Sequence, residues 1–353
     1  MKKNILILAA AFFMICSLFA GGKKDNSATN SSTPKIVTTI FPEYDWVKNI
    51  IGTNPAGAEL TMLLGNGADL HSYQPTVADI MKVSICDLFI YVGGESDKWV
   101  DDALKEAVNK NMVVVNLLDV LGDSVKEEEL IEGMQASEHH HDHDDDDEDE
   151  DHHHEDADEH HEHHHDEDEE EVEYDEHVWL SLKNAAILCN AIADAVCKVD
   201  STNAAAYKAN AADYIAKLNA LDAEYVETVA GSPVKTVLFG DRFPFRYLVD
   251  DYGLSYYAAF AGCSAETEAS FETIAFLAKK VDELSLNSIM TIEGNNHKIA
   301  QTIAQNTIAK NQKILTLDSM QSVTSKDVKD GVNYLSIMET NLKTLKTALG
   351  TSM

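Results

Sequence analysis

Apolar and polar positions alternate along the first third of the chain in a way typical of strands separated by helices. Short apolar runs predict buried strands at residues 35–41, 58–64, 87–93 and 112–118. Apolar residues at helical spacing predict helices between them, at residues 42–52, after Pro75 and at residues 98–108. This part of the chain is therefore predicted to form a sheet covered by helices.

The last third of the chain repeats this rhythm. Strands are predicted at residues 235–240, 255–262, 287–294 and 313–318, with helical stretches at residues 272–284 and 297–310. Strand and helix in alternation imply parallel sheets with helices on both faces. We therefore expect an α/β protein with two α/β lobes.

The segment between the two runs predicts a long helix. Residues 184–230 contain neither proline nor glycine, and the sequence near residues 199–202 predicts a break with an N-cap. The second helix would be about 25 residues and nearly 40 Å long, at about 1.5 Å per residue. We expect an N-terminal lobe over residues 35–200, a rigid connecting helix over residues 201–230, a C-terminal lobe over residues 231–353, and a ligand cleft between the lobes.

The N-terminus resembles a secretory signal peptide over residues 1–20. Two lysines precede an apolar run at residues 5–15, which is too short to span a membrane. Either Cys16 is the lipid-modified residue of a bacterial lipoprotein, or cleavage follows Ala20. A polar tether covers residues 21–34. Both alternatives place the protein outside the cytoplasm, in the periplasm or at the cell surface.

Composition is dominated by one tract, residues 138–171. All its residues except Ala157 are histidine, aspartate or glutamate: 12 are histidines and 21 are acidic. Removing these acids from the formal net charge of −34 leaves −13 for the remainder. Nucleic acid and anionic lipid are disfavoured as partners, because both need a basic surface. A cation is the more natural ligand.

We interpret this tract as a mobile loop of weak, exchanging metal sites, because it has no residues that could form a core. A solvated acidic spacer is the alternative. The run at residues 161–165 matches the zinc-protease pattern H-E-x-x-H, but no apolar helical face flanks it. The auxiliary histidines are His139, His140, His141, His143, His152, His153, His154, His160, His161, His163, His164 and His165.

Four further cysteines show no repeated spacing. Cys189 and Cys197 would lie about 12 Å apart in one predicted helix, beyond the reach of a disulfide. We expect Cys86, Cys189, Cys197 and Cys263 to be small buried thiols rather than metal or redox residues.

Two isolated histidines lie in polar loops, where ligands of open α/β sheets bind. His71 stands in "GNGADLHSYQP" and His177 in "DEHVWLSL", and Tyr73 and Trp179 follow them closely. From spacing alone, a structural or exposed role is the more usual one for such histidines, and metal binding is the alternative.

These motifs resemble those of the zinc and manganese solute-binding lipoproteins of bacterial ABC uptake systems. That family has one histidine in a Gly-x-Asp-x-His-x-Tyr-x-Pro loop and another in His-x-Trp-Leu. The long helix, the signal peptide and the acidic, histidine-rich insertion also match. The resemblance implies a monomeric transport protein rather than an enzyme, with His71 and His177 as metal ligands and an ABC permease with its ATPase as partners. A surface adhesin, a storage lipoprotein and a zinc hydrolase are the alternatives.

The sequence departs from the family at Arg242, where a third histidine ligand is common. A guanidinium has no lone pair for a metal. Either Asp241 supplies an oxygen ligand, or Arg242 pairs with a carboxylate and leaves a shell completed by water.

Other carboxylates lie near predicted strand ends. The resemblance implies that Asp318 is a ligand, with helix or turn capping as the alternative. Glu268 and Glu293 are expected to pair with an arginine or the backbone rather than with metal. Two imidazoles with one or two carboxylates suit Zn²⁺, with Mn²⁺ as the alternative if oxygen donors dominate. Metal affinity is expected to fall below about pH 6.5, because bound imidazole must be neutral.

Overall fold

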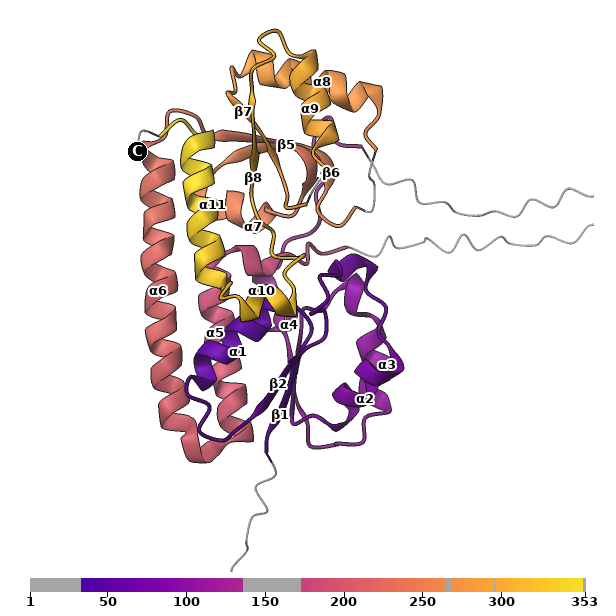
Figure 1. Ribbon diagram of the computed structural model, residues 1–353, viewed down its shortest axis with the longest axis vertical. Coiled ribbons are helices and arrows are strands. Elements are labelled where there is room, and N and C mark those ends of the chain that lie inside the picture. Colours follow the sequence, from indigo (N-terminus) through magenta and orange to yellow (C-terminus); the bar gives the residue numbers. More distant parts are fainter. Residues whose placement is uncertain (1–32, 136–172, 265–267, 295, 352–353) are drawn as a thin grey trace, which may run out of the picture. The chain divides into compact units, whose positions relative to one another are not determined.

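The structure is a computed structural model of the chain and describes residues 33–135, 173–264, 268–294 and 296–351 (Figure 1). The predicted signal peptide with Cys16, nearly all of the tether and the whole tract at residues 138–171 lie outside these ranges. Within the described ranges, no helix is both long and apolar enough to cross a membrane.

The first lobe contains a four-stranded parallel sheet in the order β2-β1-β3-β4. Its strands are β1 (Lys35–Thr38), β2 (Glu59–Met62), β3 (Leu88–Tyr91) and β4 (Val113–Asn116). Strand β3 is buried along its whole length, as expected for a central strand of a parallel sheet. The helices of this lobe are α1 (Phe41–Ile51), α2 (Val77–Ile85), α3 (Trp99–Lys105) and α4 (Leu117–Leu121), with short 3-10 helices at Leu70–Ser72, Glu95–Asp97 and Gly122–Ser124.

The second lobe repeats this arrangement, with the strand order β6-β5-β7-β8. Its strands are β5 (Thr236–Phe243), β6 (Ser255–Ala261), β7 (Ser288–Thr291) and β8 (Lys313–Thr316). Its helices are α7 (Arg246–Tyr252), α8 (Phe271–Glu283), α9 (Lys298–Asn306) and α10 (Ser325–Lys329). Two parallel-sheet α/β lobes therefore match the predicted fold class.

Three longer helices flank the two sheets (Figure 1). They are α5 (Leu182–Val199), α6 (Ala204–Gly231) and α11 (Tyr334–Ala348), with 3-10 helices at Val178–Leu180 and Ser201–Asn203. Helix α6 has 28 residues. The break that the sequence predicts near residues 199–202 lies between α5 and α6, where Asp200 accepts a hydrogen bond from the backbone N–H of Thr202.

Helix α6 is hydrogen-bonded to another helix near each of its ends. Near its start, the side chain of Asn210 donates to the carbonyl of Ile50 in α1, at 2.9 Å. Near its end, the hydroxyl of Tyr225 donates to the carbonyl of Met338 in α11, at 2.7 Å. The helix passes Gly52 so closely that a Cβ there would lie 2.5 Å from the Asn210 side chain.

The largest buried apolar cluster runs through both lobes. It includes Ile36 and Ile90 of the first sheet and Phe239 and Met290 of the second, together with apolar side chains of α5, α6 and α11. One continuous core restrains relative movement of the lobes more than two separate cores would. The lobe boundaries expected from the sequence remain predictions.

Most of the predicted strand bounds differ from those observed, and two of the strand ends have a local cause. The predicted strand at residues 112–118 ends at Asn116, whose side chain accepts from the Asp119 N–H and so starts α4. Strand β5 runs beyond the expected end at Gly240 to Phe243, with an irregular register between Phe239 and Arg242. Short apolar runs do not reveal such local capping or bulges.

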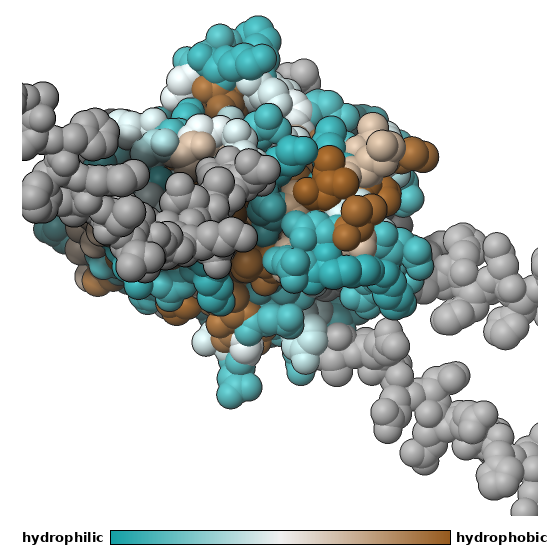
Figure 2. All heavy atoms as spheres, turned by 90° about the horizontal axis from the view of Figure 1, so that it is seen from below, coloured by the Kyte–Doolittle hydropathy of each residue, from teal (hydrophilic) through white to brown (hydrophobic). Residues whose placement is uncertain are grey.

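The surface is mainly hydrophilic, with scattered hydrophobic patches on the face shown in Figure 2. Helix α2 carries three exposed apolar side chains at four-residue spacing: Val77, Met81 and Ile85.

Candidate metal centre

His71 is positioned by a short 3-10 helix that follows β2. Asp69 starts this helix, because its Oδ1 accepts the backbone N–H of His71 at 3.0 Å. The His71 Nδ1 atom lies 2.9 Å from the Ser96 hydroxyl and 3.4 Å from Glu176 Oε2. Oxygen partners at Nδ1 favour a proton on that nitrogen and leave the lone pair on Nε2.

His177 is completely buried at the start of the 3-10 helix Val178–Leu180. Asp175 Oδ1 accepts its backbone N–H at 2.8 Å and lies 2.9 Å from its Nδ1. The indole of Trp179 packs beside the imidazole, with ring centroids 5.2 Å apart, and its N–H donates to the carbonyl of Ser319. The neighbouring carboxylate therefore orients this imidazole in the same way as the first.

The two imidazoles meet through their Nε2 atoms, which lie 3.1 Å apart. The side-chain Nε2 of Gln321 is 2.8 Å from His177 Nε2 and 3.4 Å from His71 Nε2. An amide N–H₂ group can donate to both lone pairs, so Gln321 occupies the place between the rings that a cation would compete for. Cys263 joins this cluster, since the ligand atoms of His71, His177 and Cys263 all lie within 4.8 Å of one another.

The pKa of His71 is lowered to about 3. Burial is the main cause, and the neighbouring His177 and Arg242 charges add to it. A histidine with this pKa is neutral at pH 7, as metal binding requires. The expected fall in affinity below about pH 6.5 therefore does not come from protonation of His71.

Buried carboxyl groups surround the imidazoles. Burial raises the pKa of Glu176, and burial together with the charge of Glu176 raises the pKa of Asp97 to about 7. Glu176 Oε2 makes no hydrogen bond to the described residues, although it lies 3.4 Å from His71 Nδ1. Burial and nearby carboxylates likewise raise the pKa of the Cys263 thiol. A nearby dication would offset the cost of burying these negative groups.

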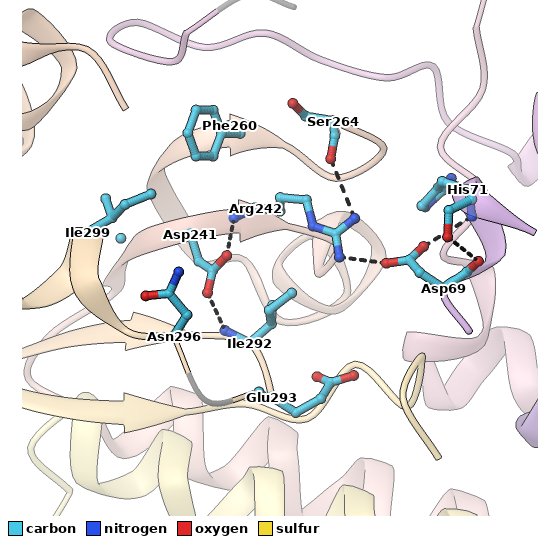
Figure 3. A pocket seen from close by; sticks show the side chains of 13 residues that line it. Asp69, His71, Asp241, Arg242, Phe260, Ser264, Ile292, Glu293, Asn296 and Ile299 are labelled. Carbon is cyan, nitrogen blue, oxygen red and sulfur yellow. Dashed lines mark hydrogen bonds and ion pairs between the residues drawn. The ribbon is translucent and has the colours of Figure 1, made fainter. Parts of the chain in front are cut away.

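Arg242 turns to a carboxylate, as one of the two alternatives predicted. Its Nη2 lies 2.6 Å from Asp69 Oδ2, and its Nη1 donates to the carbonyl of Ser264 at 3.4 Å (Figure 3). The Arg242 charge lowers the pKa of Asp69 against the opposing effect of burial. Asp69 thus uses one oxygen for the His71 loop and the other for Arg242.

Asp241 and Asp318 lie outside the three-residue cluster of the described chain. Asp241 accepts backbone N–H groups from Arg242 at 2.9 Å and Ile292 at 3.3 Å. Asp318 Oδ1 accepts the Met320 N–H at 2.8 Å, which is the capping role that the sequence left open. Burial and the charge of Glu293 raise the pKa of Asp318 to about 6. Neither carboxylate is directed at the imidazoles by these contacts, and their role as ligands stays a prediction.

Of the two glutamates, Glu293 pairs with the backbone, as expected, whereas the expected pairing of Glu268 stays a prediction. Glu293 accepts from the backbone N–H groups of Ser319 at 2.6 Å and Gln321 at 3.1 Å, so it shapes the loop that presents Gln321. Glu268 is exposed.

Comparison with known proteins decides the family. Residues 36–348 match the model of the family described as "Zinc-uptake complex component A periplasmic" (ZnuA). The chain belongs to this family.

Curated relatives and solved structures agree with the ZnuA family. The chain is 30% identical to the zinc-binding protein AdcA of Streptococcus pyogenes serotype M1, over 98% of this chain but only 61% of that protein's length. It is 29% identical to the high-affinity zinc uptake system protein ZnuA of Bacillus subtilis, over 98% and 97% of the two chains. The Zn(II)-bound ZnuA-like domain of Streptococcus pneumoniae AdcA is 27% identical, with a TM-score of 0.65 and coverage of 90% and 99%.

In this member of the ZnuA family, two cavities adjoin the His71 imidazole. One, of about 400 Å³, is lined by His71, Arg242 and Asp241, and Figure 3 shows these side chains around it. The other, of about 430 Å³, is lined by His71, Glu176 and Cys263. His71 thus lies between two spaces through which a solute could reach it.

Sequence reasoning missed several residues of this ZnuA-family centre. Gln321 follows the predicted strand at residues 313–318 but was not singled out, and Cys263 was expected to be an ordinary buried thiol. Asp175 and Glu176 directly precede His177, and this acidic pair was a signal for carboxylates that orient imidazoles.

Proposed function

We propose that this protein is an extracytoplasmic solute-binding protein that captures Zn²⁺ between its lobes and delivers it to a membrane ABC permease. The observation that carries this proposal is the meeting of His71 Nε2 and His177 Nε2 at 3.1 Å, in a largely buried place, with both Nδ1 atoms held by oxygen partners. Two imidazoles whose Nε2 atoms converge are a suitable start for a metal shell.

Zinc is the cation that the donor chemistry and the relatives favour. Imidazole suits Zn²⁺, whereas Mn²⁺ prefers sites rich in carboxylate and carbonyl oxygen. Asp241 and Asp318 already use oxygens for backbone N–H groups, which weakens the manganese alternative. The names of the relatives in Streptococcus and Bacillus support the same cation for those proteins.

Transport, rather than catalysis, is the proposed role. The family is named for a component of a zinc-uptake complex, which supports a permease and its ATPase as partners. Its periplasmic description and the N-terminal sequence support a place outside the cytoplasm. Anchoring through Cys16 is the finer proposal, and the related AdcA of Streptococcus pneumoniae is named a lipoprotein.

The tract at residues 138–171 is proposed as an accessory. Its 12 histidines and 21 acidic residues would concentrate zinc near the cleft through weak sites. The cleft itself is proposed to hold the tightly bound ion.

Zinc titration of matched variants tests this division. We expect one tight site in the protein, which remains when residues 138–171 are deleted and is lost when His71→Ala and His177→Ala are combined. His297→Ala is the control, because His297 is the remaining histidine outside the tract and lies outside the cluster. If deletion of the tract abolished all tight binding, or the double variant kept it, the cleft proposal would be wrong.

A further inference from the structure

The thiol of Cys263 lies beside the two imidazoles, on a loop of the other lobe. Its sulfur and the nearest ring nitrogens of His71 and His177 all lie within 4.8 Å of one another. In a tetrahedral zinc shell, with Zn–N of about 2.0–2.1 Å and Zn–S of about 2.3 Å, donor atoms are separated by roughly 3.3–3.6 Å. Small side-chain movements would therefore bring all three donors to bonding distance of one ion.

We propose that Cys263 is a third protein ligand, so that the centre binds its cation through two imidazoles and one thiolate. The inference rests on the proposed function and goes beyond it, because it assigns a ligand and a class of cation. Thiophilic cations such as Zn²⁺ are favoured by such a donor set, and Mn²⁺ is disfavoured.

Gly262 allows the loop after β6 to approach His177. A Cβ at this position would lie 3.0 Å from Cε1 and 3.1 Å from Nδ1 of the His177 ring, and 2.9 Å from the carbonyl oxygen of Phe243. A larger residue would push the loop away from the imidazole, and Cys263 with it. The glycine therefore has a positional role beside the thiol.

The same loop is held on both sides of the cysteine. The backbone N–H of Cys263 donates to Glu128 Oε1 at 3.0 Å, and the carbonyl of Ser264 accepts from Arg242 Nη1 at 3.4 Å. These contacts fix the backbone that carries the thiol. A fixed backbone reduces the ordering cost of bringing the sulfur to a metal.

The thiolate also supplies what Arg242 cannot. The guanidinium has no lone pair, and it is directed to Asp69 rather than to the imidazoles. When the sulfur–metal bond forms, the Cys263 S–H bond breaks and its proton leaves to solvent. The bound cation then gains one negative charge from the lobe that carries Arg242.

Cobalt substitution tests the sulfur ligand in the intact protein under reducing conditions. Co²⁺ bound by a thiolate gives an intense near-ultraviolet charge-transfer band, and the tract at residues 138–171 contains no cysteine that could produce it. We expect this band to saturate at one equivalent per protein molecule, to disappear in Cys263→Ala and to remain in Cys197→Ala. Cys197 is a matched control, since it is also partly buried but lies in α5, outside the cluster.

Alkylation of the unmodified protein gives a test that does not depend on a variant folding. Zinc is expected to slow iodoacetamide labelling of Cys263 at least tenfold and to leave labelling of Cys197 unchanged, as measured by peptide mass spectrometry. Cys263→Ala should lower zinc affinity by at least roughly tenfold, since even residues that only orient ligands are worth 10–100-fold.

The outcomes separate the two proposals. If zinc binds tightly and needs both histidines, but cobalt gives no thiolate band and zinc does not protect Cys263, the sulfur ligand is wrong and the proposed function stands. If zinc does not bind tightly to the unmodified protein, the proposed function fails and the sulfur ligand fails with it.

Discussion

The two lobes differ in whether the polar side chains near the centre are already hydrogen-bonded to the backbone. In the first lobe, His71 and His177 have their Nδ1 atoms held by oxygen partners, and their Nε2 atoms converge. In the second lobe, Asp241, Asp318 and Glu293 accept backbone N–H groups from within that lobe. A donor atom can bind metal only if it is not already needed elsewhere, so residue type and proximity to a cleft are insufficient to identify a ligand.

Asp318→Asn tests the second lobe by measuring how the buried Asp318 carboxylate affects the stability of the protein. The pKa of Asp318 is raised to about 6, so its charge is costly in the folded state above that pH. The variant should be more stable than wild type at pH 7 by up to about 3 kcal/mol, because each pKa unit corresponds to about 1.4 kcal/mol. As pH falls from about 6 to about 4, folded wild type takes up the proton and this difference should vanish.

Denaturant unfolding at several pH values measures that difference, and zinc titration of the same variant adds a second reading. The contrast predicts that zinc affinity stays within about threefold of wild type, below the roughly 10–100-fold that residues orienting a metal ligand contribute. A loss of tenfold or more would support the predicted role of Asp318 as a metal ligand and break the contrast between the lobes.

Asp175→Asn tests whether the carboxylate beside His177 orients that imidazole for metal binding. Asp175 Oδ1 contacts both the backbone N–H and the Nδ1 of His177, so its loss should disturb the proton position and ring orientation. We expect zinc affinity to fall by about 10–100-fold, equivalent to about 1.4–2.7 kcal/mol. Asp241→Asn is the second-lobe counterpart, and the contrast predicts that it changes affinity by less than about threefold. Equal effects of the two variants would contradict the contrast.

Arg242→Gln tests the charge that the second lobe places in the cleft. Removing the guanidinium leaves Asp69 without its ion-pair partner and makes the surroundings of the imidazoles more negative by one charge. We expect zinc affinity to rise by about tenfold at low ionic strength and by less in high salt. Arg246→Gln is the control, since Arg246 is the only other arginine of the chain and pairs with Glu129. Unchanged or weaker binding in Arg242→Gln would show that the ion pair has a mainly structural role.

The smallest effect is expected from acid on His71 itself. Because the pKa of His71 is lowered to about 3, its ring should remain neutral from pH 7 to about pH 4 in the metal-free protein. Imidazole NMR signals, assigned with a His71→Gln variant, should therefore hardly move over that range. Titration of the His71 signals near pH 6.5 would show that the first-lobe site is more open to water than the structure indicates.

Local patterns explain why the fold could be predicted from the sequence. Apolar runs and helical spacing are properties of neighbouring residues, so they located the eight strands named above and the break before α6. The ends of strands were predicted less well where a side-chain cap starts a helix, as Asn116 does for α4. The irregular register in β5 depends on pairing with β6 and has no comparable local signal.

The centre could be predicted only in part, because it joins distant segments. His71 and His177 carry recognisable motifs, although they are 106 positions apart. Gln321 and Cys263 carry no motif and become notable only through their closeness to these imidazoles. The sequence predicted, as one of two alternatives, that Arg242 pairs with a carboxylate. It could not identify Asp69 as that carboxylate.

Helix α6 suggests how a firmly joined pair of lobes can still release an ion. Its 28 residues span about 42 Å, and its two halves are bonded to α1 and α11. Such a helix acts as a lever: a tilt of about 5° at one end displaces the other by about 4 Å. Metal–ligand bonds tolerate only about 0.2 Å of error. The proposed permease partner would therefore need to impose only a slight rotation to separate the donors of one lobe from those of the other.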